Sequence, residues 1–220
     1  MPLNRFLNLP QEEQDRVYEV AKKQFALHGY DVMSLNLLLK ELKISKGQFY
    51  YWFEDKADLF LSILDQGITS LVAILERHGS PSNPQDYWSH LRSARLLVEA
   101  YWNDQEYVEI GTMIGEQIAD NHPICERLKA SAEPIKNYWR NQIISGQDWG
   151  LVRSDLSADT LVVLLDTVGD QFYRIILDLY SSSPGKEAEA GVLHELLGTT
   201  LRSLIETPDG GKERNSENTA

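Results

Sequence analysis

The chain has 220 residues, of which 42% are hydrophobic and 25% charged, and a formal net charge of −12. No apolar run is longer than that from Leu161 to Leu165, which is far shorter than the about 20 residues of a membrane span. Residues 1–5 lack the apolar region of a signal peptide. The composition therefore predicts a globular protein with a substantial core and no membrane partner.

The first thirty residues predict one amphipathic helix. Its apolar residues recur every three or four positions, at Val17, Val20, Ala21 and Phe25. Pro10 is typical of a helix start, and Gly29 is typical of a left-handed residue that ends a helix.

Three further helices follow within the next fifty residues. Ser34 is a good N-cap for a short helix that carries Leu35, Leu38, Leu39 and Leu42. Ser45 and Gln48 match the capping-box pattern at the start of a third helix, and Asp55 can cap a longer fourth. Two short helices joined by a tight turn inside a helical bundle are typical of a helix-turn-helix.

The rest of the chain is also patterned as helices. After a break at residues 79–84, the spacing predicts helices over about 91–102, 110–118, 124–143, 161–179 and 193–204. Pro134 predicts a kink or a boundary within the third of these helices. No strand pattern is present, so we expect an all-α protein of about nine helices, with residues 208–220 as a polar, disordered tail.

The residues of the helix-turn-helix carry a family resemblance. Gly29-Tyr30, Ser34, the run from Ile44 to Phe53, Lys56 and Leu59 resemble, without a gap, the N-terminal signature of the tetracycline-repressor (TetR) family. The connector over 150–155 is also similar to one common in that family. The resemblance implies a helix-turn-helix DNA-binding domain over residues 1–55, a larger helical ligand-binding and dimerisation domain over 56–207, and a disordered tail over 208–220.

The predicted DNA-binding residues lie mainly in the first turn of the third helix, which in a helix-turn-helix enters the major groove. They are Ser34, Lys43, Ser45, Lys46, Gly47, Gln48, Tyr50, Tyr51 and Lys56. Gln48 can pair with the N6/N7 edge of adenine, and Lys46 with guanine acceptors or a phosphate. Gly47 allows close approach of the backbone, and Lys56 lies at a helix N-terminus that favours an anion.

Several of these residues have an alternative structural role. The Gln48 amide can instead bond the Ser45 N–H as the second half of the capping box. Ser34 can act only as a cap, although the resemblance implies that it also reaches a phosphate. The resemblance makes Tyr50 a phosphate contact and Tyr51 a groove contact, but one of the two tyrosines can instead pack under the helix.

Charge and two departures from the family pattern qualify this prediction. Residues 1–60 contain 8 Lys and Arg against 9 Asp and Glu, whereas residues 61–220 contain 13 against 24. Charges are screened within roughly 10 Å, so a local basic surface can still bind DNA.

Two residues depart from the family pattern. Leu39 replaces the usual small residue of the second helix, and Lys43 replaces the turn glycine, at a cost of about 1 kcal/mol if its φ is positive. Arg5 alone precedes the first helix, so we expect no strongly basic arm.

The C-terminal helices predict a dimer and an effector site. The helix over 161–179 is apolar on two sides, as a helix buried on both sides must be. We assign to a homodimer surface Val163, Leu164, Phe172, Leu197, Leu201 and Leu204. The resemblance implies a small-molecule pocket, for which the candidates are Tyr101, Trp102, Trp139, Asp170, Phe172 and Tyr173. The aromatic residues among them are equally typical of an ordinary core, and Asp170 can pair with Arg174.

Other classes of protein receive little support. Cys125 is the only cysteine, which fits a reducing cytoplasm or a simple core position, and the histidines lack metal-ligand spacing. No cofactor is predicted, and no nucleophile elbow, phosphate loop or spaced Ser/His/Asp set indicates an enzyme. We expect a cytoplasmic regulator, acting as a repressor on palindromic double-stranded DNA and released by a small-molecule effector. The alternative is a degenerate regulator that has become an interaction protein without DNA binding.

Overall fold

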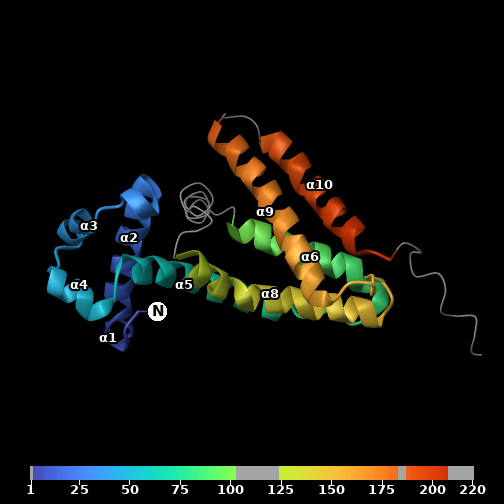
Figure 1. Cartoon of the computed structure of the whole chain (residues 1–220), viewed down its shortest axis with the longest axis horizontal. Coiled ribbons are helices and arrows are strands. Elements are labelled where there is room, and N and C mark those ends of the chain that lie inside the picture. The colour runs from blue at the N-terminus through green and yellow to red at the C-terminus, as the bar shows by residue number, and fades with distance from the viewer. Residues whose placement is uncertain (1, 103–123, 183–186, 208–220) are drawn as a thin grey trace, which may run out of the picture. The chain divides into compact units, whose positions relative to one another are not determined.

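The computed structural model describes residues 2–102, 124–182 and 187–207 (Figure 1). Within these ranges the helices are α1 (Asn4–Leu7), α2 (Gln11–Val32), α3 (Leu35–Leu42), α4 (Lys46–Trp52), α5 (Lys56–His78), a 3-10 turn (Pro84–Asp86), α6 (Tyr87–Trp102), α8 (Ile124–Asp148), α9 (Ala158–Ser182) and α10 (Glu187–Ile205). In these residues the β-structure is one isolated bridge between Val152 and Glu206. The all-α prediction is confirmed.

The chain packs as two compact units. The first unit is drawn from residues 1–73 and 100–134, and the second from residues 74–99 and 135–220. Helices α5, α6 and α8 contribute residues to both units. The predicted helix over 110–118 and the predicted tail over 208–220 lie outside the described residues.

The first unit is built around an aromatic core. The rings of this core come from α1, α2, α4 and α5 and from the residue that follows α4. Five phenylalanine side chains in it are at most 1% exposed: Phe6, Phe25, Phe49, Phe53 and Phe60. The centroids of Phe6 and Phe53 lie 4.6 Å apart, and those of Phe25 and Phe60 lie 4.9 Å apart. Burying one such ring contributes about 2–3 kcal/mol, so the five rings together make a large contribution to the stability of the unit.

Helix α1 is an addition to the predicted elements. It has only four residues, too few for a helical period to be recognised in the sequence. Phe6 anchors it in the aromatic core, and the Leu3 N–H donates to the carbonyl of Trp52 at 2.9 Å. The N-terminal segment is therefore fixed to the end of α4.

Gly29 interrupts α2 where the sequence predicts its end. Its φ of 72° and ψ of 167° are non-helical, and one more turn of helix continues to Val32. The left-handed region is open to glycine at little cost, which explains the residue type at this bend.

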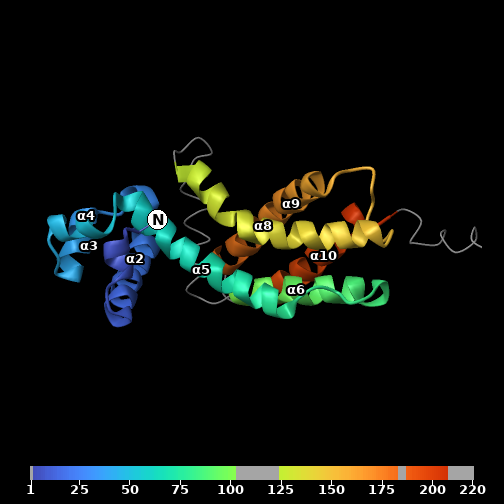
Figure 2. The ribbon, with the colours of Figure 1, turned by 90° about the horizontal axis from the view of Figure 1, so that it is seen from below.

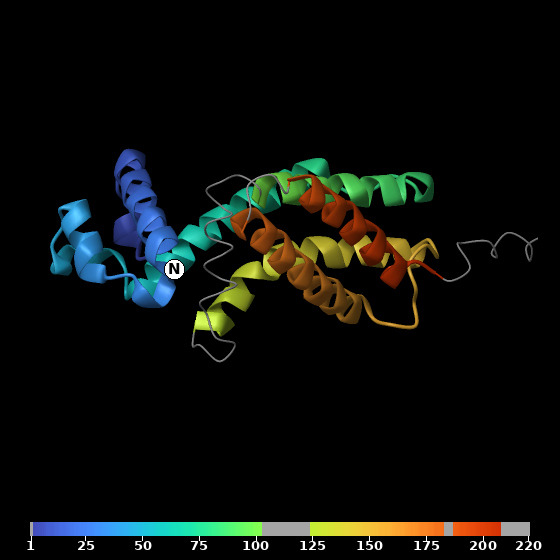
Figure 3. The ribbon, with the colours of Figure 1, turned by 90° about the horizontal axis from the view of Figure 1, so that it is seen from above.

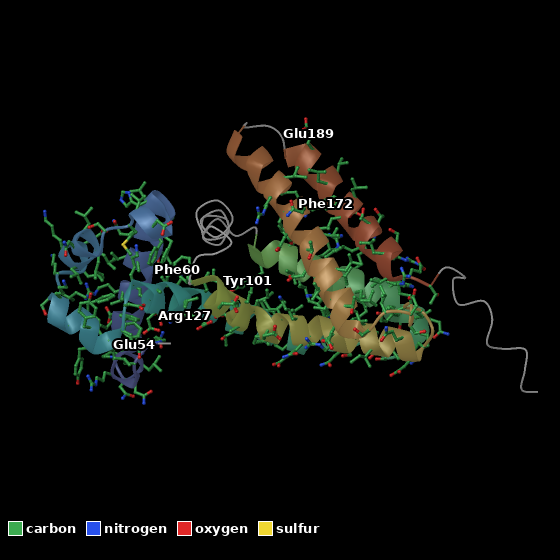
Figure 4. All side chains as sticks on the ribbon, in the orientation of Figure 1. Glu54, Phe60, Tyr101, Arg127, Phe172 and Glu189 are labelled. Carbon is green, nitrogen blue, oxygen red and sulfur yellow. The ribbon has the colours of Figure 1, made fainter. Side chains whose placement is uncertain are left out.

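The start of α8 belongs to the first unit. Ile124 is 2% exposed and Leu128 is partly buried, and both pack against the aromatic core. The guanidinium of Arg127, which Figure 4 labels, lies 3.3 Å from an oxygen of Asp58 and 3.8 Å from one of Asp55, at the N-terminus of α5. Contacts therefore extend this compact unit beyond the predicted boundary at residue 55.

The second unit has its own core, with Tyr87 fully buried at its centre. The Tyr87 hydroxyl donates to the carbonyl of Gln142 at 3.0 Å, and burial raises the pKa of this hydroxyl. A Cβ at Gly146 would lie 2.3 Å from the Tyr87 hydroxyl oxygen, so the ring requires a glycine there.

The connector over 150–155 is tied to the end of α10. The Arg153 N–H donates to the carbonyl of Ile205 at 2.8 Å, and the Thr207 N–H donates to the carbonyl of Leu151 at 3.2 Å. Helix α8 continues through Pro134, the residue at which the division between the two units falls. The two views in Figures 2 and 3 show α9 and α10 running side by side.

Helix α5 is long and apolar enough to cross a membrane by length and composition. However, 61% of its most apolar window is buried within the protein, as is usual for a core helix. The hydropathy of α5 is therefore weak evidence for a membrane span.

Candidate DNA-binding site

The turn between α3 and α4 has a defined hydrogen-bonded geometry. The Lys43 N–H donates to the carbonyl of Lys40 at 3.2 Å, and the Ile44 N–H donates to the carbonyl of Leu39 at 3.1 Å. These two bonds form a Schellman motif, which places Lys43 in the left-handed conformation with φ 55° and ψ 37°. The departure from glycine at this position therefore leaves the turn intact and places strain on Lys43.

Ser45 begins α4 as the sequence predicts. Its Oγ accepts a hydrogen bond from the Gln48 N–H at 3.1 Å, and its carbonyl accepts one from the Phe49 N–H. Across the described residues, the Gln48 amide makes no return bond to the Ser45 N–H. The capping box is thus half formed, and the exposed Gln48 amide is free to meet a base edge.

Helix α4 has one buried and one exposed side. Phe49 and Trp52 are 1% and 3% exposed in the aromatic core, whereas Tyr50 and Tyr51 are 45% and 53% exposed. Both tyrosines therefore point outward, and the alternative in which one packs under the helix is not observed. Gly47 is also exposed, and a Cβ placed there would meet only Ser45 Oγ, at 3.8 Å, so packing does not require this glycine.

Cations lie beside the exposed tyrosines. The Lys46 ammonium is 5.9 Å from the centroid of the Tyr50 ring. The Arg5 guanidinium is 4.5 Å from the centroid of the Tyr51 ring. The sequence singled out Lys46, but Arg5 was missed as a neighbour of this surface because the fold of α1 was not predicted.

Lys56 has a structural environment that the sequence did not indicate. Its ammonium donates to the carbonyls of Tyr30 at 2.6 Å, Asp31 at 3.3 Å and Met33 at 3.5 Å. It also lies 4.6 Å from the centroid of the Tyr30 ring. Burial lowers the pKa of the ammonium, an effect opposed by Asp31. Lys56 thus holds the end of α2 against the start of α5, and its contact with phosphate stays a prediction.

Ser34 occupies the N-cap position of α3, but its side chain makes no capping hydrogen bond. Ser34 is therefore the N-cap residue that the sequence predicts, but only its backbone carbonyl takes part, accepting from the N–H groups of Leu37 and Leu38. Asp55 does cap α5, with Oδ1 accepting from the Asp58 N–H at 2.6 Å.

The predicted pocket residues are divided between the two units. Tyr101 belongs to the first, where its hydroxyl donates to the carbonyl of Gly67 at 2.8 Å. The second holds Trp139, Asp170, Phe172 and Tyr173. Trp139 packs against the core of that unit, Asp170 is exposed, and burial raises the pKa of Tyr173. The Trp102 side chain lies outside the described residues, so the pocket stays a prediction.

The predicted dimer residues also differ in exposure. Val163 of α9 is 61% exposed, whereas Leu197 of α10 is 1% exposed and packs inside the unit. Partly buried positions are held by Leu164, Phe172, Leu201 and Leu204. The structure adds three exposed apolar residues that the sequence did not single out: Ile175, Val192 and Leu196.

The comparison with known proteins agrees with this geometry. The sequence model of the family described as bacterial regulatory proteins, tetR family, matches residues 17–63, which include α3, the turn and α4. Residues 17–63 therefore match the N-terminal domain of the TetR family, and the chain is similar to transcriptional regulators of that family.

Two relatives show how far the similarity extends. YuxN of Bacillus subtilis, an uncharacterized HTH-type transcriptional regulator, is 39% identical over 129 residues, which are 57% of this chain and 41% of YuxN. The chain thus matches less than half the length of YuxN. SCO4008 of Streptomyces coelicolor, an HTH-type transcriptional repressor, is 25% identical over 166 residues, which are 71% of this chain and 76% of SCO4008.

Solved structures share the fold over almost the whole chain. A TetR-family regulator from Chloroflexus aurantiacus has a TM-score of 0.62 and 23% identity, covering 94% of this chain and 99% of its own. SmeT, the repressor of the Stenotrophomonas maltophilia multidrug efflux pump SmeDEF, has a TM-score of 0.69 and 12% identity, covering 92% and 93%. At these identities the likeness establishes the TetR-family fold alone.

The strain at Lys43 predicts a stabilising substitution. Lys43→Gly should raise the free energy of unfolding by about 0.5–1 kcal/mol, because relief of the left-handed strain exceeds the entropy that glycine adds to the unfolded chain. Urea denaturation measures the change. As a control, Lys40→Gly in the helical part of α3 should lower the same free energy by about 0.5–1 kcal/mol. Equal destabilisation by both variants would contradict the strain at Lys43.

The carbonyl contacts of Lys56 predict a loss of stability on removing its charge. Lys56→Met keeps most of the apolar stem but leaves three carbonyls without their donor, which should lower the free energy of unfolding by about 1–3 kcal/mol. The matched control, Lys40→Met at an exposed position, should change it by less than about 0.5 kcal/mol. Unchanged stability in Lys56→Met, measured by thermal and urea unfolding, would show that these contacts are energetically unimportant.

Proposed function

We propose that the protein is a dimeric repressor that binds operator DNA through the exposed first turn of α4 and is released by a small-molecule effector. The observation that carries the DNA-binding part is the free amide of Gln48. It lies in a turn fixed by the Ser45 cap, on the exposed side of a helix whose opposite side is buried. A fixed helix that presents an uncommitted amide beside Lys46 and exposed tyrosine hydroxyls has the chemistry for base and phosphate contacts.

The dimer is proposed on the exposed apolar side chains of α9 and α10. Four of them are at least 49% exposed, namely Val163, Ile175, Val192 and Leu196. Adjacent helices that both expose large apolar residues are candidates for burial against a second copy. A two-fold dimer would present two α4 helices to two half-sites, which supports a palindromic operator.

The effector response is proposed to act through the start of α8. Arg127, in the first turn of α8, contacts Asp58 and Asp55 at the N-terminus of α5. Asp55 lies only three residues after the end of α4. Helix α8 also supplies residues to the second unit. A shift of α8 on effector binding would therefore act on the segment next to α4, and a coupling of about 1–3 kcal/mol suffices for a response.

Binding to the DNA upstream of the protein's own gene tests the proposal. The 220-residue chain should bind one palindrome there, and its affinity should fall steeply as the salt concentration rises. Absence of binding to this region and to random duplex alike would favour the degenerate interaction protein. Compounds that raise the thermal stability of the free protein should then be tested for release of the bound DNA.

Gln48→Ala should relax the preference at one base pair of each half-site and cost about 1–3 kcal/mol of binding free energy per contact. Its stability should stay unchanged, because the Gln48 amide makes no capping bond. Ser45→Ala provides the contrast, since loss of the cap should lower the free energy of unfolding by about 1 kcal/mol. Affinities on a set of single-base operator variants, with melting temperatures alongside, distinguish base reading from a capping role.

A charge on the proposed dimer surface should dissociate the dimer. Val163→Glu and Leu196→Glu each place a carboxylate at an exposed position that the dimer would bury, so the dissociation constant should rise by about 100-fold or more. The control is Val32→Glu, which changes an apolar residue 75% exposed on α2. Light scattering on size-exclusion fractions measures the masses, and dimers in both test variants would rule out this surface.

A further inference from the structure

The cations of the first sixty residues differ in what they contact. Three of them are engaged within the protein. Lys56 binds carbonyls at the end of α2, Arg16 binds Glu13 and the carbonyl of Leu42, and Lys22 pairs with Glu19. These side chains are therefore less available to a phosphate than their charge alone indicates.

Arg5 differs from these three cations, because within the described residues it contacts a tyrosine ring and neither a carbonyl nor a carboxylate. Its guanidinium lies over Tyr51, and in the described part of the chain it forms no ion pair with a carboxylate. The face of an aromatic ring can hold a guanidinium in place. The N–H groups, which lie in the plane of the guanidinium, then remain available to other acceptors. Arg5 is thus oriented without being neutralised.

The backbone that carries Arg5 is also fixed. The adjacent Phe6 is fully buried, with its ring centroid 5.8 Å from that of Trp52 and 5.2 Å from that of Tyr18. On the other side, the Leu3 N–H bonds to the last carbonyl of α4. Arg5 is therefore held on a short helix that moves with α4, which contrasts with a flexible basic arm.

We infer that Arg5, stacked on Tyr51 in the last turn of α4, is a DNA-phosphate contact in addition to the pair formed by Lys46 and Tyr50. The inference rests on the proposed DNA binding and names a residue for it. Lys46 follows the Ser45 cap and Tyr51 precedes the last residue of α4. A cation therefore lies over each of two consecutive exposed tyrosines in the second half of α4, and Gln48 precedes both tyrosines in the same helix.

This arrangement makes a specific prediction about the role of Tyr51. The ring serves as the support that positions the guanidinium, in addition to any contact of its own hydroxyl. A Tyr51→Phe substitution keeps the ring and should retain the Arg5 contact, whereas Tyr51→Leu removes the ring and should weaken it.

The test is the salt dependence of binding by Arg5→Gln, measured by fluorescence anisotropy on the palindrome found upstream of the gene and on a random duplex of equal length. Losing one phosphate contact per protomer should reduce the slope of log K against log salt by about 0.9, or about 1.8 for a dimer, on both duplexes. Lys129→Gln, at an exposed lysine of α8 in the same unit, makes the same charge change and should leave the slope unchanged. Arg5→Lys should keep most of the slope because it keeps the charge.

The outcomes separate this inference from the proposed function. If the wild-type chain binds and Arg5→Gln keeps its slope, the phosphate contact is ruled out while DNA binding stands. If Arg5→Gln weakens binding only through a lower melting temperature, with the slope intact, Arg5 serves only to hold α1 and the inference fails. If the wild-type chain binds neither duplex, the proposed function itself fails. A reduced slope in Arg5→Gln, with the same reduction in Tyr51→Leu and little further loss in the double variant, supports the stacked contact.

Discussion

The burial of Phe49 and Trp52 is the interaction on which the candidate DNA-binding surface depends. Both side chains enter an aromatic core shared by α1, α2 and α5, and this fixes the rotation of α4 about its own axis. With one side of a seven-residue helix buried, the remaining residues have to face outward. A rotation of α4 by one residue, about 100°, would bury Tyr50 and expose an apolar ring, so the surface is specified by packing more than by charge.

The sequence predicted most of this unit because its signals are local. The cap at Ser45, the cap at Asp55 and the bend at Gly29 are properties of a few consecutive residues. Lys56 and Arg5 could not be placed in the same way. Their partners, the end of α2 and the Tyr51 ring, are more than 20 residues distant along the chain. Ser34 shows a further limit, since an N-cap residue type does not ensure the capping bond.

The C-terminal helices were predicted correctly as elements, whereas the dimer and pocket residues assigned on them stay predictions. Helical spacing identifies which residues avoid water, but it does not distinguish a core from a pocket or a dimer surface. Leu197 illustrates this. Its position in the helical repeat suited a dimer surface, but the structure buries its side chain within its own unit. Tyr101 likewise has the aromatic character of a pocket residue, yet its hydroxyl bonds to the backbone of α5.

The position of the start of α8 bears on how this protein can be divided. A fragment ending at residue 73 would contain the whole helix-turn-helix but would lack Ile124, Leu128 and Arg127. It would expose part of the aromatic core and take the guanidinium away from Asp58, which is 1% exposed. The unit that holds the helix-turn-helix is therefore not formed by one continuous segment of the chain. Exchange of such modules between family members would have to carry along a matching first turn of α8.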